Sequence, residues 1–457
     1  MSSLSIASKI ASSSLTAAQV QLSVTSSNIA NADTEGYTAK SAAVSSATTS
    51  GVGTGVAVTD ITSNVSELLI AQLAGATSNA AAAEKTASYL DQLQTALGHT
   101  TSGDGGGTSL ANLIAEAETA LSDLANTPES ETLAVTAVDA LDSLTSEIRE
   151  LSSDIQSLRE TADKDIGNAV ESANQAIEEI ASLNDLIVTA QTRGESTADL
   201  EDQRNSALVS LSEFMGVTAF TSDDGSMDVY TNSGQLLVGE NAYKLDFSTT
   251  SNIKAGDTYA SGDLSGITVN GIDITGGIST GSISSLLELR DETLPGVQAS
   301  VDELASGLIS DLNVVRPGLL TGADGSDISV DSTVLELPSS LLDSTDPYGQ
   351  AADLLSAMQG DHLFADAGNL GERTTDFASY ATDILSNVVT MTNSASTKLD
   401  RAEDELTTIS DTITSTYGVN LDEEIARLSE LETLYSVSSQ VLSVVQEMFD
   451  DLIAAVQ

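Results

Sequence analysis

The residue types that most often catalyse reactions or bind metal ions are sparse in this chain. It has no cysteine and two histidines, His99 and His362, and both lie close to glycine in stretches that read as loops. Catalysis or metal binding by histidine needs partner residues at fixed spacings, such as H-E-x-x-H or a Ser–His–Asp set, and no such constellation can be assigned. We interpret both histidines as surface residues and predict that the chain is not an enzyme and has no metal site and no cofactor.

Two short stretches have some features of ligand-binding loops. Residues 51–55, Gly-Val-Gly-Thr-Gly, lack the G-x-G-x-x-G spacing of a nucleotide site and precede extended residues rather than a helix. Residues 324–327, Asp-Gly-Ser-Asp, lack the D-x-D-x-D-G run and the closing glutamate of a calcium loop. We interpret the first stretch as a flexible arm and the second as a turn.

Composition restricts the kinds of partner that the chain can have. Its 457 residues include 68 acidic and 16 basic ones, which gives a formal net charge of −52. A field of that sign repels nucleic acid and anionic membranes, so we predict neither as a partner. There is no apolar run of about 18 residues that could span a membrane, and no basic segment followed by an apolar core as in a signal peptide.

The strongest structural signal lies at the C-terminal end. From Leu428 onward, large apolar residues recur at alternating steps of three and four, interrupted only by the small Ser438. The series is Leu428, Leu431, Tyr435, Leu442, Val445, Phe449, Leu452 and Val456. A second stripe beside it comprises Leu434, Val437, Val441, Val444 and Met448. This spacing predicts a long helix, capped at Asn420, that has a coiled-coil seam and a second apolar stripe in need of partners.

The N-terminal end has a matching pattern. Leu4, Ala11, Leu15, Ala18, Leu22 and Ile29 recur at helical spacing. The predicted helix of about 30 residues ends at Asn31–Tyr37, where Asn, Asp and Gly favour a turn. Residues 41–60 are small, Thr and Val residues, which predict an extended, strand-like arm.

Between the two ends, the apolar period changes from helical to strand-like and back. The predicted helices span residues 61–97, 109–126, 129–191, 198–215, 283–315 and 376–417, and short strands fill 217–247 and 262–278. We therefore predict a mainly α fold with an inserted β region. The expected domains are a terminal coiled coil (1–60 and 418–457), a helical body (61–215, 283–316 and 373–417), a β-rich insert (216–282) and an irregular segment (317–372).

Several stretches resemble a known family. Residues 27–37, Ser-Asn-Ile-Ala-Asn-Ala-Asp-Thr-Glu-Gly-Tyr, resemble the signature of flagellar rod, hook and hook-associated proteins, and residues 418–424 resemble the closing segment of that family. In the middle, residues 199–204, 211–213, 224–229, 234–239 and 283–312 are similar to segments typical of the hook-associated members of that family. The chain is thus identified by resemblance as a flagellar axial protein of the hook-associated type.

The chain departs from the family pattern in three places. Glu35 stands where the family usually has proline, and Thr38-Ala39-Lys40 replaces the usual Ser-Arg-Gln. Residues 313–375 lack the family's segment containing His and Phe and are too few for the outer β domain of many relatives. The resemblance therefore implies a reduced or missing outer domain.

The resemblance implies a structural protein that forms a ring at the junction between hook and filament. Its implied partners are other copies of itself, the hook protein, a second junction protein, and a cytoplasmic export chaperone at the C-terminal helix. It would be exported without a cleavable signal peptide and act outside the cell. The residues expected at subunit interfaces are Leu15, Leu22, Asn28, Ile29, Asn31, Gly36, Tyr37, Leu421, Leu428, Leu431, Tyr435, Leu442, Val445, Phe449 and Leu452.

Two alternatives stay open on the sequence. Within the same family, the chain could be a hook or distal rod protein. Its long helical middle and residues 199–204 make this alternative less favoured. In a different class, it could be an acidic secreted binding module, dependent on calcium. A calcium titration by calorimetry distinguishes that second alternative, because it predicts micromolar binding coupled to folding.

Overall fold

The computed structural model describes residues 3–34, 36–49, 52–63, 65–98, 107–343 and 345–455. Long helices dominate these residues, and the strands form small antiparallel sheets of two or three members, which confirms the predicted mainly α fold with an inserted β region. No helix within the described ranges combines the length and the hydropathy needed to cross a membrane.

Backbone contacts divide the chain into two compact units, which we describe separately. Unit 1 comprises residues 1–78, 172–244 and 403–457, and unit 2 comprises residues 79–171 and 245–402. Three helices contribute residues to both units: α2 (Glu67–Ala96), α4 (Glu131–Arg193) and α10 (Phe377–Tyr417).

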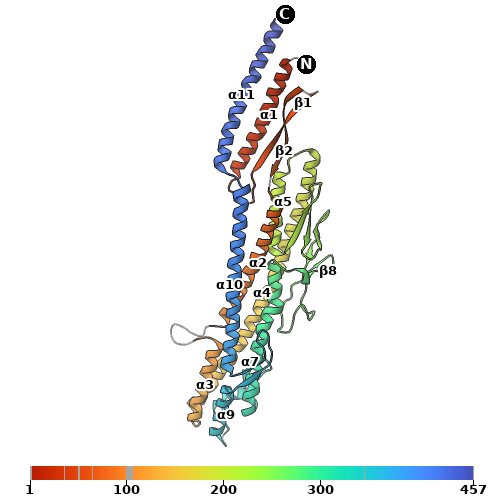
Figure 1. Ribbon diagram of the computed structural model, residues 1–457. Helices are drawn as coiled ribbons and strands as arrows, with labels where there is room; N and C mark the ends of the chain where they lie inside the picture. Colours follow the sequence, from red (N-terminus) through yellow and green to blue (C-terminus); the bar gives the residue numbers. More distant parts are fainter. Residues whose placement is uncertain are drawn as a thin grey trace. The chain divides into compact units, whose positions relative to one another are not determined.

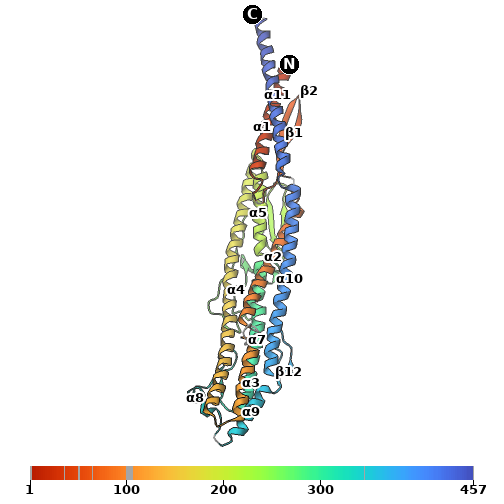
Figure 2. The same ribbon diagram turned by 90° about the vertical axis from the view of Figure 1, so that its left-hand side faces the viewer.

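In unit 1, the two terminal helices lie side by side. Figures 1 and 2 show α1 (Ser3–Ala30) next to α11 (Leu421–Ala454), with the hairpin of β1 (Lys40–Thr49) and β2 (Val52–Ser63) beside α1. The predicted cap of α11 is present, since the Asn420 side chain accepts hydrogen bonds from the backbone N–H groups of Asp422 and Glu423 at 3.1 and 3.4 Å. Both terminal helices have nearly the predicted bounds.

The predicted arm is a β-hairpin, and it is longer than expected. β1 and β2 pair antiparallel along their length, with Ala42 opposite Ile61 and Ser41 opposite Thr62. The expected helix over residues 61–97 therefore starts only at Glu67. The β-branched side chains of Ile61 and Thr62 fit a strand with a partner better than the first turn of a helix.

The rest of unit 1 packs a small sheet on two helices. The sheet has the order β3 (Val217–Thr221), β4 (Met227–Thr231), β5 (Leu236–Val238), and α5 (Ala198–Phe214) precedes it. Asn184 of α4 holds β4 at Met227, accepting from its N–H at 2.9 Å and donating to its carbonyl at 2.8 Å. Arg204 of α5 is buried and donates to Asn184 at 3.0 Å and to the Gly225 carbonyl at 2.6 Å. These bonds attach the β3–β4 turn to the helices.

Unit 2 is built mainly from helices. Its remaining helices are α3 (Leu110–Asn126), α6 (Ser282–Glu288), the π-helical turn η2 (Leu289–Thr293), α7 (Leu294–Val315), α8 (Ser332–Glu336) and α9 (Pro347–Gln359), with 3-10 turns η1 (Thr275–Gly277) and η3 (Pro338–Leu341). Its short strands are β6 (Leu245–Asp246), β7 (Thr268–Val269), β8 (Ile272–Asp273), β9 (Leu320–Thr321), β10 (Ser329–Val330), β11 (His362–Phe364) and β12 (Arg373–Thr375). Apolar residues at helical spacing along α4, α7 and α10 form the core of this unit.

The segment expected to be irregular, residues 317–372, contains regular structure. Besides α8 and short strands, it forms α9, which packs on α3 and α7 (Figure 2). The Asp346 side chain caps α9 by accepting from the Gly349 N–H at 3.0 Å, and Pro347 occupies the first helical turn. Leu354 and Met358 are fully buried on one face of α9. The elements are too short for periodicity to reveal them among Gly, Asp and Pro residues.

The interpretation of His362 as a surface residue is wrong. β11 places its ring against Phe377, with ring centroids 5.5 Å apart, and its Nδ1 lies 2.9 Å from a carboxylate oxygen of Asp311. Its side chain is 18% exposed. Phe364 of the same strand also contacts the ring, with centroids 4.8 Å apart, but Phe377 and Asp311 belong to other elements, so the local sequence could not indicate them. His99 lies outside the described residues.

A cluster of buried charges connects α4 to η2 and to the loop of residues 254–257 within unit 2. The Arg290 guanidinium and the Asp163 carboxylate are both fully buried, and their closest N–O distance is 2.6 Å. Arg159, also fully buried, donates to the Arg290 carbonyl at 2.9 Å, to the Lys254 carbonyl at 2.9 Å, and to the Asp257 carbonyl. Such a cluster is stable because each buried charge has close partners.

Candidate assembly surface on the terminal helices

One face of α11 packs against α1, and the predicted seam lies there. Along α11 the buried residues recur every seven positions: Glu424, Leu431, Ser438 and Val445. Leu428, Leu442 and Phe449 are half-buried beside them. Three residues expected in or near the seam, Leu421, Tyr435 and Leu452, are 36–54% exposed. The structure therefore brings most, but not all, of the predicted seam together.

The α1 side of the seam is made largely of small residues. Ala11, Ala17 and Ala18 are buried, and the larger Leu15, Leu22 and Ile29 are half-buried. Small side chains allow two helices to approach closely, but they contribute little apolar area. Two polar contacts cross the seam: the hydroxyls of Ser14 and Ser438 are 2.9 Å apart, and the Gln19 amide nitrogen lies 3.5 Å from the Tyr435 hydroxyl.

The contact between Ser14 and Ser438 allows a direct test of the pairing in solution. The chain has no cysteine, so Ser14→Cys with Ser438→Cys introduces the only two thiols. We expect a disulfide to form within one chain under mild oxidation, because the two hydroxyls lie 2.9 Å apart across the seam.

Non-reducing electrophoresis and mass mapping of the oxidised monomer detect this bond. The matched control pairs Ser14→Cys with Ser436→Cys, which is exposed on a different face of α11 and should stay reduced. Equal oxidation of both pairs would contradict the seam described here.

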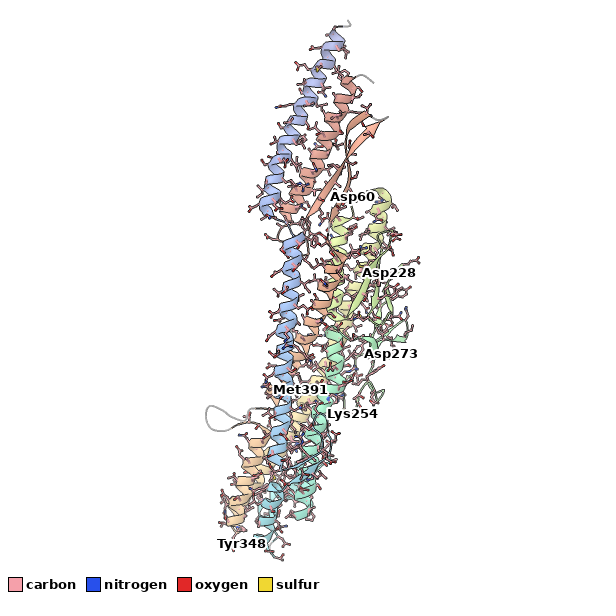
Figure 3. All side chains as sticks on the ribbon, in the orientation of Figure 1. Asp60, Asp228, Lys254, Asp273, Tyr348 and Met391 are labelled. Carbon is pink, nitrogen blue, oxygen red and sulfur yellow. The ribbon has the colours of Figure 1, made fainter. Side chains whose placement is uncertain are left out.

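A second stripe on α11 has no partner within the described chain. Leu434, Val437, Val441, Val444 and Met448 are between 43% and 54% exposed. We call these five residues the outer stripe. The outer stripe lies beside the seam, because each of its residues is three positions after or one position before a buried residue of α11. Figure 3 shows that side chains along α11 also project away from α1. A continuous apolar stripe of this kind on a surface helix indicates a protein interface.

Asn28, Asn31 and Tyr37, predicted as interface residues, form hydrogen bonds within the chain, and only Asn28 of the three is buried. Asn28 is buried: its Oδ1 accepts from the Tyr37 hydroxyl at 2.9 Å and the Lys40 N–H at 3.0 Å, and its amide donates to the Lys40 carbonyl at 2.9 Å. Asn31 donates to the Ser27 carbonyl at 2.9 Å. These contacts give Asn28 and Tyr37 a role in positioning the chain that leaves α1.

Gly36 is required by its conformation and by its surroundings. Its φ of +74° lies in the left-handed region, where residues with a Cβ are strained. A Cβ added there would also lie 2.5 Å from the Ser206 hydroxyl of α5. The turn therefore approaches α5 closely, and this neighbour was not predicted.

Among the described residues, no group of three or more His, Asp or Glu side chains is arranged to hold a metal ion. The stretch 324–327 is a turn in which the Asp327 carboxylate accepts from the backbone N–H groups of Ala323 and Asp324 at 2.7 and 3.1 Å.

Comparison with known proteins gives two family matches. Residues 90–328, just over half of the chain, match the family described as flagellar hook-associated protein FlgK helical domain. Residues 9–38 match the family described as flagella basal body rod protein. The first match covers most of the helical middle, and the second covers most of α1 and the turn after it.

The chain is also similar to individual proteins. It is 25% identical over 310 residues to flagellar hook-associated protein 1 of Escherichia coli K12, covering 65% of this chain and 54% of that protein. The corresponding Salmonella typhimurium protein is 24% identical over 310 residues, with 65% and 53% covered. The chain thus spans about half the length of the curated relatives it matches. A solved structure of the flagellar hook junction protein FlgK from Burkholderia pseudomallei aligns at 25% identity with a TM-score of 0.45, covering 55% of this chain and 44% of that one.

Proposed function

The chain belongs to the FlgK family of flagellar hook-associated proteins, and from this premise we propose that it is a structural component of the junction between flagellar hook and filament. The observation that carries the proposal is the outer stripe, an apolar surface on a helix that is already paired with α1. In this proposal, neighbouring copies cover the stripe and form a ring through the terminal helices. Residues 1–60 and 418–457 then act together as the assembly domain.

Energetics support coverage of the outer stripe. Complete burial of a Val, Leu or Met side chain stabilises by about 1.5–3 kcal/mol, so five half-exposed residues represent a large unused contribution. Residues 433–446, which carry most of the stripe, include no charged residue, whereas the chain as a whole has a net charge of −52. Repulsion between copies therefore opposes association, and the uncharged stripe is the part of α11 suited to overcome it.

The proposed partners follow from the same surface and family. They are other copies of the chain, the hook protein, a second junction protein, and a cytoplasmic chaperone that covers α11 before export without a cleavable signal peptide. The protein would then reside outside the cell in the flagellum and have a structural rather than an enzymatic role. A hook or distal rod role is the second candidate, supported by the match of residues 9–38 to rod proteins.

Immunogold electron microscopy of flagella from the native host tests the proposal. We expect label at one narrow position, where the hook ends and the filament begins, because a junction protein occupies a single ring. Cells without this gene should make hooks without attached filaments. Label distributed along the whole hook or at the distal rod would instead favour the second candidate.

A further inference from the structure

Two stretches that are far apart in the sequence meet at one buried carboxylate in unit 1. The side chain of Asp202 in α5 is 8% exposed. Its Oδ2 accepts from the Thr38 N–H at 2.9 Å and from the Lys40 ammonium at 2.6 Å, and its Oδ1 accepts from the Thr38 hydroxyl at 2.8 Å. All three donors belong to Thr38 and Lys40, so this one side chain of α5 makes three contacts with the segment between α1 and β1.

Lys40 is enclosed by its partners. Its side chain is 4% exposed, and the ammonium also lies 3.0 Å from the Asp199 carboxylate and 3.5 Å from the centre of the Tyr37 ring. Burial alone would lower the pKa of Lys40, but hydrogen bonds to Asp202 and Asp199 raise it above its usual value. The two carboxylates differ in exposure, 8% for Asp202 and 73% for Asp199, so the buried one interacts more strongly with the ammonium.

These contacts lie where the hairpin begins and ends. The Thr38 hydroxyl is 2.6 Å from that of Ser63, the last residue of β2, and Lys40, the first of β1, pairs with Ser63. The backbone N–H of Ala39 donates to the Tyr417 carbonyl at 2.7 Å. We call the described residues 36–49 and 52–63 the arm. A two-stranded hairpin is marginally stable by itself, so its order depends on what holds its base and on α1 beside it.

We propose that Asp202 is a latch that docks the arm onto α5, so that the arm is ordered only while the carboxylate holds Thr38 and Lys40. Few other contacts join the arm to α5 and the loop that precedes it. They include the Ser196 hydroxyl, which donates to the Ile61 carbonyl at 3.1 Å, and the approach of Gly36 to Ser206. The latch is a contact within one chain, so it does not depend on what covers the outer stripe.

Hydrogen–deuterium exchange of the full-length monomer tests the latch. Asp202→Asn removes the charge and keeps the size, and we expect amide exchange to accelerate at least ~10-fold across both strands of the arm, since about 1.4 kcal/mol corresponds to tenfold. Asp199→Asn removes a carboxylate from the same ammonium at an exposed position and should change exchange less than about 2-fold. Peptides from residues 141–160 of unit 2 should be unaffected.

A substitution in the arm itself tests the latch even if Asp202→Asn also perturbs α5. Lys40→Met leaves α5 unchanged and should reproduce the faster exchange of the arm. The double variant should exchange no faster than Asp202→Asn alone, because both changes open the same latch. Three results would overturn the proposal: a wild-type arm without protection, acceleration confined to residues 38–40, or additive effects of the two substitutions.

Discussion

Asp substitutions of Val437 and Val444 together are expected to abolish incorporation of the protein into the flagellum while leaving the monomer folded. Both residues are more than 50% exposed in the outer stripe, so the monomer loses little packing. In an assembly that covers the stripe, burying the exposed halves of the two side chains contributes about 1.5–3 kcal/mol, or ~10-fold to ~100-fold in affinity, and burying the new carboxylates weakens association further. Swimming motility and filament counts in cells that carry only the variant measure the effect, and far-UV circular dichroism monitors the fold.

The matched control is Ser436→Asp with Ser443→Asp. These residues are also exposed and seven positions apart, and they precede the stripe residues by one position, which places them on a different flank of α11. This variant has the same added charge and should assemble nearly as well as the wild type. By contrast, Asp at Leu442 and Phe449 should disrupt the pairing with α1 as well as assembly. Normal motility of the Val437/Val444 variant would refute the outer stripe as an assembly surface.

Asp163→Asn is expected to lower the free energy of unfolding by about 3–5 kcal/mol, because it leaves the Arg290 guanidinium buried with one fewer counter-charge. The two side chains are fully buried and 2.6 Å apart. Urea unfolding followed by far-UV circular dichroism measures the change, since the chain has no tryptophan for fluorescence. Replacing both partners together, Asp163→Leu with Arg290→Met, should be less destabilising than Asp163→Asn, because the buried guanidinium is removed together with its counter-charge. The other carboxylate beside Arg290, that of Asp291 at 2.7 Å, is 14% exposed, so water can solvate it.

Unit 2 contains a matched ion pair for comparison. Asp383 and Arg373 also lie 2.6 Å apart, but their side chains are 42% and 34% exposed. Asp383→Asn should therefore cost less than about 1 kcal/mol, because water screens the exposed pair. Equal losses for Asp163→Asn and Asp383→Asn would show that burial does not determine the strength of these pairs.

The terminal helices show what the sequence by itself determined. Steps of three and four in α1 and α11 indicated both helices, Asn420 indicated the cap, and the two series on α11 distinguished the seam from the outer stripe. These features follow from contacts between residues a few positions apart, because the helical repeat places such residues on one face. The family resemblance of residues 27–37 and 199–204 likewise depended on the order of residues in the chain.

The tertiary structure alone decided which of these stretches contact each other. The chain has 68 acidic residues that could pair with Lys40, and nothing near Lys40 in the sequence selects Asp202 as its partner. The same holds for Arg290 with Asp163 and for His362 with Phe377. Periodicity reports which face of an element is buried. The partner of a buried charge or ring depends on which two segments the fold brings into contact. The sequence around either residue does not indicate that contact.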